Sequence, residues 1–428
     1  MKRMVISPLI SRLVVLIISG MFLLATGVSV YAEEIVKIGV SYPEAGPYAK
    51  MGLEAKRAGD LAVEEVNAAG GILGKKIQLI YVPSQPNPKL SKQMALDLID
   101  KEGLQMLDGG STSAETIAIG KAALQRNKLY FATVAYSTSV TGEEGHKNVF
   151  RESNDSYMAA KVLANYLNKN FAGKKYFYIT TDYTFGWTTE DAIRKFTNTT
   201  DKTVNRGVLT PFGAMDFKDA LSAAKDSNAE VLVLNLFGRD MVIAVKTAYA
   251  MGLKKTMQII VPIVNLSMAQ GAGPEAMEGI IGSESWNWEV PFKFNYPKGI
   301  AFVKKYEELY KEYPTEIGEA AYVIPFVYKE AVERAGTFDT KAVINALEGH
   351  KYVGLKDEQY WRPWDHQSIQ TMYAVKCKPA AEVKKDKYQA DYFETIDTLK
   401  GDDAAIGQKE WTDIRTNVGL PAALEEAK

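Results

Sequence analysis

The sequence is poor in the residues that most often carry metal, redox or catalytic chemistry. Its 428 residues include one cysteine, Cys377, and three histidines, His146, His350 and His366. One cysteine permits no intrachain disulfide, and the scattered histidines lack the spacing of metal ligands. We therefore expect these histidines to be surface or hydrogen-bonded structural residues, and we expect no metal and no cofactor.

The short motifs of common enzymes are also missing. The sequence has no G-x-S-x-G nucleophile elbow, no H-E-x-x-H and no strand followed by G-x-G-x-x-G. The stretch "GGILGKK" lacks the glycine spacing and the Ser/Thr of a phosphate loop. These absences favour a binding role over catalysis, so we expect no enzyme; an enzyme with an unrecognised site is the least favoured alternative.

The N-terminus has the pattern of a secretory signal peptide. Lys2, Arg3 and Arg12 give a basic start, "LVVLIISGMFLLATGVSV" is apolar, and "VYA" ends at Ala32 with small residues for cleavage. The alternative is a single membrane anchor, because the apolar run approaches spanning length. No lipoprotein cysteine follows the cleavage site. We expect a soluble periplasmic protein.

An excess of basic charge is absent. Without the first 32 residues the chain has 48 basic and 52 acidic residues, a net charge near −4. Such a balance is no electrostatic footprint for nucleic acid. Lys-rich stretches such as "EVKKDKYQ" are expected to be solvated surface.

From Glu34 onward, short β-rich runs alternate with helical segments, as in "IVKIGVSY", "GLEAKRAGDLAVEEVNAA" and "KIQLIYV". The same rhythm starts again after about residue 150. This alternation predicts βαβ units, with parallel sheets covered by helices on both faces. We therefore expect an α/β protein with two lobes of similar size, between which the chain crosses more than once.

The stretch "GGSTSAETIAIG", residues 109–120, follows the apolar run "LQMLD". Thr112 and Glu115 have the spacing of a capping box and are expected to start a helix. Ser111 then lies at the carboxyl end of a strand and before a helix N-terminus, where an open α/β sheet places its ligands. Free backbone N–H groups and a hydroxyl at such a corner favour a carboxylate.

The next predicted strand ends in a similar way. In "FATVAYSTSVTGEEG", Ala135, Tyr136 and Ser137 lie beyond the strand tip and could reach the same ligand. For Ser139 and Thr141 an ordinary Ser/Thr-rich loop is the favoured interpretation.

Several segments together resemble one family. They are "VKIGVSYPEAGPYAKMGLEAKRAGDLAVEEVNAAGGILGKKIQLIYVPSQPNP", the hydroxyl corner, "TTDYTFGW" and "AYAMGL". The chain looks like the type I periplasmic binding proteins of the leucine/isoleucine/valine class, which deliver solutes to ABC importers. The "GP-x-A-x-x-G" and "N-A-x-GG-I-x-G" patterns are moderately specific alone and strong in this order. The resemblance covers essentially the whole chain after the signal peptide.

The resemblance implies two Rossmann-like lobes with parallel sheets, joined by three crossovers, that close on a ligand in the cleft. The implied boundaries are 1–32 for the signal peptide, 33–152 for the first lobe, 153–284 for the second lobe, 285–355 for a return to the first lobe, and 356–428 for a return to the second lobe with a polar tail.

The resemblance also implies the site residues. Ser111, Ser113, Ala135 and Ser137 fall where the ligand carboxylate is held, with Thr112 beside them. Trp286 and Trp288 fall near a crossover, and Tyr322 on a returning helix. The remaining pocket residues are Tyr48, Met51, Tyr136, Phe185, Phe237, Ile263, Trp288 and Tyr322. Without the resemblance, aromatic residues at these places would more often belong to the core.

One departure bears on the ligand. Amino-acid binders of this class place a glutamate, which pairs with the ligand ammonium, where this chain has Ile263, and often a tyrosine where it has Phe237. An ammonium without a counterion is costly to bury. We therefore expect a hydrophobic or aromatic carboxylate; Asp182, Asp240 or Glu319 would have to supply the anion for an amino acid.

The expected function is that of the substrate-binding component of an ABC-type uptake transporter, monomeric and partnered by an inner-membrane permease. The same role with a branched-chain or other hydrophobic amino acid as ligand is one alternative. A ligand-sensing receptor domain is another, because one architecture serves both uses.

Overall fold

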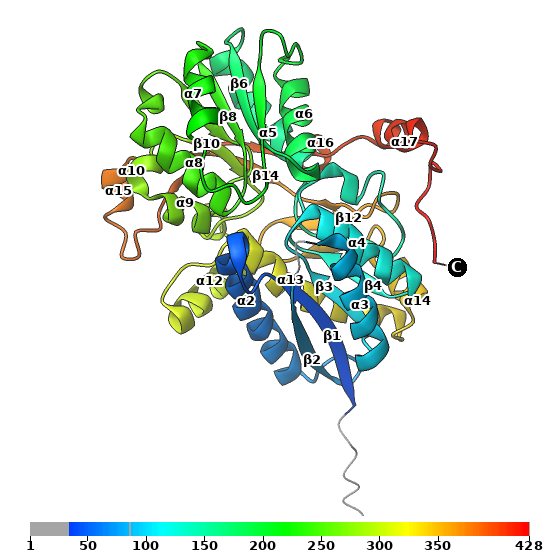
Figure 1. Ribbon diagram of the computed structural model, residues 1–428. Helices are drawn as coiled ribbons and strands as arrows, with labels where there is room; N and C mark the ends of the chain where they lie inside the picture. Colours follow the sequence, from blue (N-terminus) through cyan, green and yellow to red (C-terminus); the bar gives the residue numbers. More distant parts are fainter. Residues whose placement is uncertain (1–33, 85–86, 428) are drawn as a thin grey trace, which may run out of the picture. The chain divides into compact units, whose positions relative to one another are not determined.

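Two sheets divide the folded unit, which begins at residue 35, into two lobes (Figure 1). The computed structural model describes residues 34–84 and 87–427. The first sheet has the order β2-β1-β3-β4-β5, and every neighbouring pair is parallel. Its strands are β1 (Ile35–Tyr42), β2 (Lys76–Pro83), β3 (Met106–Gly109), β4 (Leu129–Ala132) and β5 (Val149–Arg151).

Helices cover the first sheet, which is why its central strands are buried along their whole length. Asn87 caps α3 through its side chain, and Gly103 ends that helix at a φ of 66°. The helices of this lobe are η1 (Gly46–Tyr48), α2 (Ala49–Ala68), α3 (Pro88–Glu102), α4 (Ser113–Gln125), η2 (Thr138–Val140), α12 (Pro297–Tyr310), α13 (Glu316–Ala335) and α14 (Thr340–Leu347). Helix α13 packs along α2.

The second sheet has the order β15-β14-β10-β9-β8-β6-β7. Strands β6 to β10 pair in parallel, whereas β14 runs antiparallel to both β10 and β15. The strands are β6 (Tyr176–Thr181), β7 (Gly207–Thr210), β8 (Val231–Asn235), β9 (Gln258–Val261), β10 (Ile281–Glu284), β14 (Met372–Cys377) and β15 (Phe393–Leu399).

The helices of the second lobe begin directly after the first crossing. They are α5 (Ser156–Phe171), α6 (Thr184–Phe196), α7 (Lys218–Asp226), α8 (Arg239–Ala250), η3 (Leu253–Lys255), α9 (Leu266–Ala272), α10 (Pro274–Met277), α15 (Ala380–Val383) and α16 (Gly401–Ala404). Helix α11 (Val290–Phe294) leads back toward α12.

The chain passes between the sheets after β5, after β10 and before β14. A small antiparallel sheet of β11 (Lys351–Val353), β12 (Glu358–Trp361) and β13 (Ser368–Ile369) precedes the last passage. Trp361 of β12 packs on Phe131 and Phe150 of the first sheet, with ring centroids 5.5 and 5.6 Å apart. Trp361 thus packs with the first lobe, whereas Tyr360 and Ile369 pack with the core of the second. We propose that this segment forms the last crossing, which ends near Met372.

The tail also contacts the first lobe. Helix α17 (Gln408–Asn417) follows α16, which packs on α5 of the second lobe. Trp411 of α17 donates from Nε1 to the Thr141 carbonyl at 2.8 Å. Arg415 donates to the carbonyls of Gly142 and Gly145. The last helix therefore joins the loop that follows η2 to the second lobe.

The predicted fold class, two α/β lobes with parallel sheets, is confirmed, with the antiparallel pairs of β14 as an addition. Cys377 is buried at the end of β14. Among the described residues, no helix is both long and apolar enough to cross a membrane. The predicted signal peptide and its alternative, the membrane anchor, lie outside the described residues.

Candidate functional site

The strand tip after β3 holds a carboxylate of the protein's own. Glu115 in the first turn of α4 accepts hydrogen bonds from the hydroxyls of Ser41, at 2.8 Å, and Ser111. Ser111 in turn accepts from Ser84 at 3.0 Å. Burial raises the pKa of Glu115, and these hydroxyls oppose the rise. We call Ser41, Ser84, Ser111 and Glu115 the Glu115 corner, in which Ser111 donates to Glu115 and accepts from Ser84.

Thr112 has the predicted helix-capping role. Its hydroxyl accepts from the Glu115 backbone N–H at 3.2 Å, which confirms this part of the capping box. The neighbouring cavity of the first lobe is lined by Tyr48 and Met51 together with Ser111. The sequence prediction that these three residues share a pocket is thus consistent with their positions.

Ser113 and Ser137 lie side by side, although 24 residues separate them. The Ser137 backbone N–H donates to the Ser113 hydroxyl at 3.1 Å, and both residues are buried. Their strand tips are adjacent because β3 and β4 pair in parallel. In the same loop, the Ala135 carbonyl accepts a hydrogen bond from the Ser153 hydroxyl at 3.4 Å. The structure thus brings together three residues predicted for the carboxylate: Ser113, Ser137 and, in the loop of Ser137, Ala135.

Six aromatic rings meet between the lobes. They are Tyr48 and Tyr136 of the first lobe and Tyr183, Phe185, Phe212 and Phe237 of the second, here called the aromatic cluster. Phe237 is central, with centroids 5.1 Å from Tyr136, 5.8 Å from Tyr48 and 6.0 Å from Phe185. Such ring pairs contribute about 0.5–1.5 kcal/mol beyond burial. They provide an apolar wall suited to a ring or a branched chain.

Polar contacts extend along the first turns of α2 and complete the join between the lobes. The Tyr48 and Tyr183 hydroxyls are 3.2 Å apart, and Lys50 donates to Gln270 at 2.7 Å. Ser267 of α9 donates to the buried Glu54 carboxylate. We call these three contacts the interlobe seam, across which the two lobes touch.

Two buried carboxyls lie beside the aromatic cluster. Glu316, in the first turn of α13, accepts from the Tyr136 hydroxyl at 3.4 Å and from Asn265 at 3.1 Å. Burial raises the pKa of Glu316 to about 8. Asp240, in the first turn of α8, accepts from the Gly213 N–H at 2.7 Å, while its Oδ1 has no hydrogen-bond partner. Burial raises the pKa of Asp240 to about 6.

Comparison with known proteins assigns this arrangement to a family. The family model described as "Periplasmic binding protein" matches residues 35–385. The chain belongs to the periplasmic binding protein family. It is of the type I, branched-chain amino acid class, as the resemblance of its sequence predicted.

Three similar proteins illustrate the range of this family. The chain is 26% identical over 74% of its length to "Leu/Ile/Val-binding protein homolog 7" of Brucella abortus, of which 81% is covered. A periplasmic binding protein of Burkholderia mallei has a TM-score of 0.80 at 27% identity, covering 89% of this chain and 98% of that one. A Rhodopseudomonas palustris solute-binding protein of an ABC transporter, in complex with p-hydroxybenzoic acid, has a TM-score of 0.75 at 23% identity, with 86% and 98% covered.

Two predicted pocket residues lie elsewhere in this family member. Trp288 stacks on Tyr313 at 3.9 Å and donates from Nε1 to the Ala390 carbonyl. Tyr322 packs on Phe302 and donates to Glu65 on the side of α13 that faces α12. Neither belongs to the aromatic cluster.

The three acidic alternatives also separate. Asp182 is exposed and accepts from Trp187 at 3.1 Å, and Glu319 lies in the field of the buried Lys356 near the crossings. Only Asp240 of the three borders the aromatic cluster, where its charge acts on Tyr48 and Tyr183. Ile263 is buried in the loop after β9 and offers no charge.

Sequence reasoning missed four residues of this region: Tyr183, Phe212, Glu54 and Glu316. Tyr183 stands in the quoted "TTDYTFGW", so its aromatic neighbour Phe185 was a usable signal. Glu54 and Glu316 are buried residues of helices, but the helical pattern of the sequence does not distinguish them from acids exposed to solvent. Among the described residues, no group of three or more His, Cys, Asp and Glu is placed to hold a metal ion.

Proposed function

We propose that the chain is the periplasmic substrate-binding component of an ABC-type uptake transporter and binds a small hydrophobic or aromatic carboxylate between its lobes. The observation that carries this proposal is the aromatic cluster, which both lobes build beside the Ser113–Ser137 pair. The rings would enclose the apolar part, and the hydroxyls and backbone N–H groups at the α4 N-terminus would receive the carboxylate.

The proposal revises the predicted anchor. We assign the carboxylate to the hydroxyls of Ser113 and Ser137, with Ala135 in the same loop, because the Ser111 hydroxyl donates to Glu115. Tyr48, Tyr136, Phe185 and Phe237 remain in the proposed wall, and Tyr183 joins them. The chain would act as a monomer, carry no cofactor and deliver its ligand to a membrane permease without catalysis.

A hydrophobic amino acid is the second candidate ligand. It is favoured by Asp240, whose buried Oδ1 has no hydrogen-bond partner, and by Glu316, which could become a counterion on losing its proton. A ligand ammonium would pair with such a carboxylate and pull its pKa down. The free Asp240 oxygen is therefore the feature that separates the two ligand classes.

A thermal-shift screen followed by calorimetry tests the proposal. The compounds are leucine, phenylalanine, their 2-oxo acids, benzoate and p-hydroxybenzoic acid, the last because a relative of the same fold is complexed with it. A ligand at a thousand times its Kd stabilises the native state by about 4 kcal/mol. We expect the aromatic or oxo acids to shift the melting curve most. Binding of leucine alone would overturn the ligand class, and no shift with any compound would overturn the binding role.

Asp240→Asn refines the same experiment. If an ammonium uses Asp240, this variant weakens leucine binding and leaves benzoate binding unchanged. If the ligand is a simple carboxylate, removing a nearby negative charge leaves its affinity unchanged or raises it. Thr247→Ser, a small change on the same helix, serves as the matched control.

A further inference from the structure

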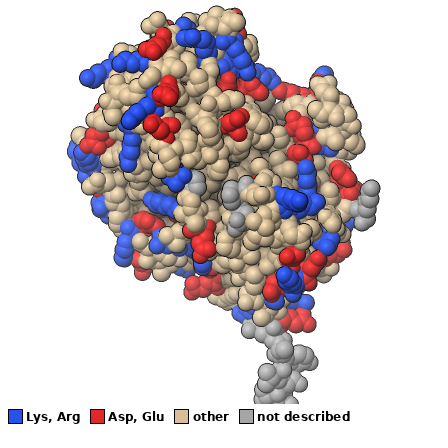
Figure 2. Space-filling view, viewed as in Figure 1, with Lys and Arg blue, Asp and Glu red and all other residues tan. Residues whose placement is uncertain are grey.

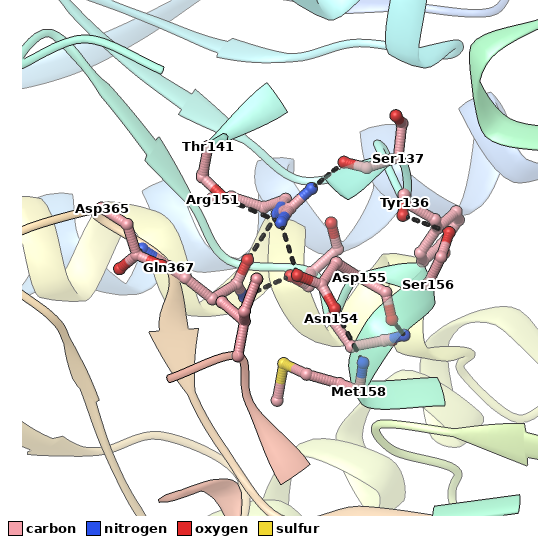
Figure 3. Close-up of polar contacts among 12 residues, drawn as sticks. Tyr136, Ser137, Thr141, Arg151, Asn154, Asp155, Ser156, Met158, Asp365 and Gln367 are labelled. Carbon is pink, nitrogen blue, oxygen red and sulfur yellow. Dashed lines mark hydrogen bonds and ion pairs between the residues drawn. The ribbon is translucent and has the colours of Figure 1, made fainter. Parts of the chain in front are cut away.

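A buried arginine ties the proposed ligand loop to the connections between the lobes. Arg151 is the last residue of β5, directly before the first crossing, and its side chain is fully buried. Figure 3 shows its polar contacts. Its Nη1 donates to the carbonyls of Ala135, at 3.3 Å, and Ser137. These two residues form the loop to which we assign the ligand carboxylate.

The other nitrogens of the guanidinium reach the two connecting segments. Nη2 donates to Asp155 Oδ2 at 3.0 Å, in the first crossing, and to Thr141 Oγ1 at 2.8 Å. Nε donates to Gln367 Oε1 at 2.5 Å, in the segment that precedes the third crossing. Figure 3 shows these partners converging on one guanidinium from different directions.

Asp155 connects this network to the second lobe. Its Oδ1 accepts from the Met158 N–H at 2.8 Å and so caps α5, the first helix of that lobe. Ser156, the next residue, donates to the Tyr136 carbonyl at 2.7 Å and lies 2.8 Å from the Thr189 hydroxyl of α6. The start of α5 is therefore bonded both to the ligand loop and to the second lobe.

Burial makes these bonds hard to give up. A buried guanidinium without a counterion is costly. Burial lowers the pKa of Arg151, the charges of Asp155 and Asp365 oppose this change, and the charge of Arg362 adds to it. Gln367 is held in turn by its own bonds to the Ser153 and Ser368 carbonyls. Rotation of the lobes that moved Asp155 or Gln367 would thus pull on Arg151.

We propose that Arg151 is a positioning residue that couples rotation about the crossings to the position of the Ala135–Ser137 loop. The inference rests on the proposed function for the meaning of that loop. The guanidinium holds the Ala135 and Ser137 carbonyls, so the loop keeps Ser137 beside Ser113 only when Asp155 and Gln367 are in place. Closure of the lobes and formation of the carboxylate site are then one event.

Asp155→Asn is the variant that tests the coupling. Asparagine is as good an N-cap as aspartate, so α5 keeps its start. The change removes the charge that pairs with Arg151. The matched control is Glu190→Gln, which neutralises another buried pair, Glu190 with Arg194 at 2.7 Å, within α6 and away from the crossings. Both variants lose a buried ion pair, and only one touches the connections.

The readouts need no ligand. Spin labels at the exposed Lys101 of α3 and Ser222 of α7, in a Cys377→Ser background, report the distance between the lobes. Hydrogen exchange of the peptide 133–141 reports the loop. We expect Asp155→Asn to broaden the interlobe distances and to speed exchange of this peptide about tenfold, because the loop loses its anchor. Glu190→Gln should change neither.

Unchanged distances and unchanged loop exchange in Asp155→Asn would overturn the coupling. A change in Glu190→Gln of equal size would do the same, since it would show a general loss of stability. If Asp155→Asn fails to fold, Gln367→Met removes the Nε bond without touching a helix cap and is expected to give the same changes at smaller size. Because no ligand is added, these results stand apart from failure of the binding screen.

Discussion

The two lobes present different chemistry to the seam between them. The first lobe brings hydroxyls and carboxyls, including Ser111, Glu115, Glu54 and Glu316, each of which has a bond within that lobe. Glu54 and Glu316 also accept bonds from Ser267 and Asn265 of the second lobe. The second lobe contributes four of the six rings of the aromatic cluster, with Asp240 at their edge. Both signs of charge are interspersed on the face shown in Figure 2, without one dominant patch. On this face, the contrast between the lobes therefore belongs to the interior.

A hydroxyl at a strand tip can be bonded by the protein itself. Ser111 and Ser137 follow neighbouring parallel strands, yet the proton of Ser111 goes to Glu115, while the Ser137 backbone bonds to Ser113. The difference between the two serines comes from Glu115, an acceptor on α4 four residues after Ser111.

The largest expected effect is a pH dependence of the unfolding free energy that arises mainly from the first lobe. Buried acids of the first lobe have raised pKa values, about 8 for Glu316 and about 7 for Asp108. The folded state keeps these protons where the unfolded state has lost them, so stability falls as pH rises from about 6.5 to about 8. The window starts there because His146, with a pKa of about 4, acts in the opposite sense at lower pH.

Urea unfolding at several pH values measures this slope, and Glu316→Gln should flatten it. Asp240→Asn on the second-lobe side should flatten it less, because its pKa is raised only to about 6. An equal slope in all three proteins would remove the assignment of the pH dependence to the first lobe.

Phe237→Ala should cost about 3 kcal/mol of unfolding free energy, the usual scale for deleting a buried ring. Phe237 contacts rings of both lobes, so the variant should also weaken binding of any aromatic acid found in the screen. Chemical denaturation and calorimetry measure the two effects. Phe237→Leu is the control that keeps apolar volume; equal losses in both variants would argue against a role for the ring itself.

Glu115→Ala should cost about 2 kcal/mol, because it leaves the buried hydroxyls of Ser41 and Ser111 without an acceptor. It should also free the Ser111 proton. Denaturation measures the first effect, and Glu115→Gln, which keeps one acceptor, should lose less. A neutral Glu115→Ala would contradict the bonding described for the Glu115 corner.

Thr112→Ala should have the smallest effect, a loss of about 1 kcal/mol from the cap of α4. Thr112→Ser should restore most of it, since serine caps equally well. Melting curves of both variants measure the change. A weakened affinity without loss of stability would instead point to a direct ligand contact.

The sequence predicted much of the fold because alternation of strands and helices leaves a strong local signal. It also placed Ser113 and Ser137 at one edge, since parallel strands end together. Tyr322 shows the limit: a tyrosine on α13 can face the lobe interface or α12, and the helical period does not choose between them. Arg151 left no signal, because its partners are separated along the chain and two of the five are backbone carbonyls.

The C-terminal helix has a mechanical consequence. Helix α16 rests on α5 of the second lobe, while Trp411 and Arg415 of α17 grip the loop at 141–145 of the first. Besides the three passages of the main chain, the lobes thus share a strap fastened at both ends, and Arg151 bonds to the same Thr141 that receives the strap. For the lobe rotation proposed above, this strap would limit the opening angle, because Glu410, next to Trp411, is bonded to Tyr157 of α5 and Lys195 of α6.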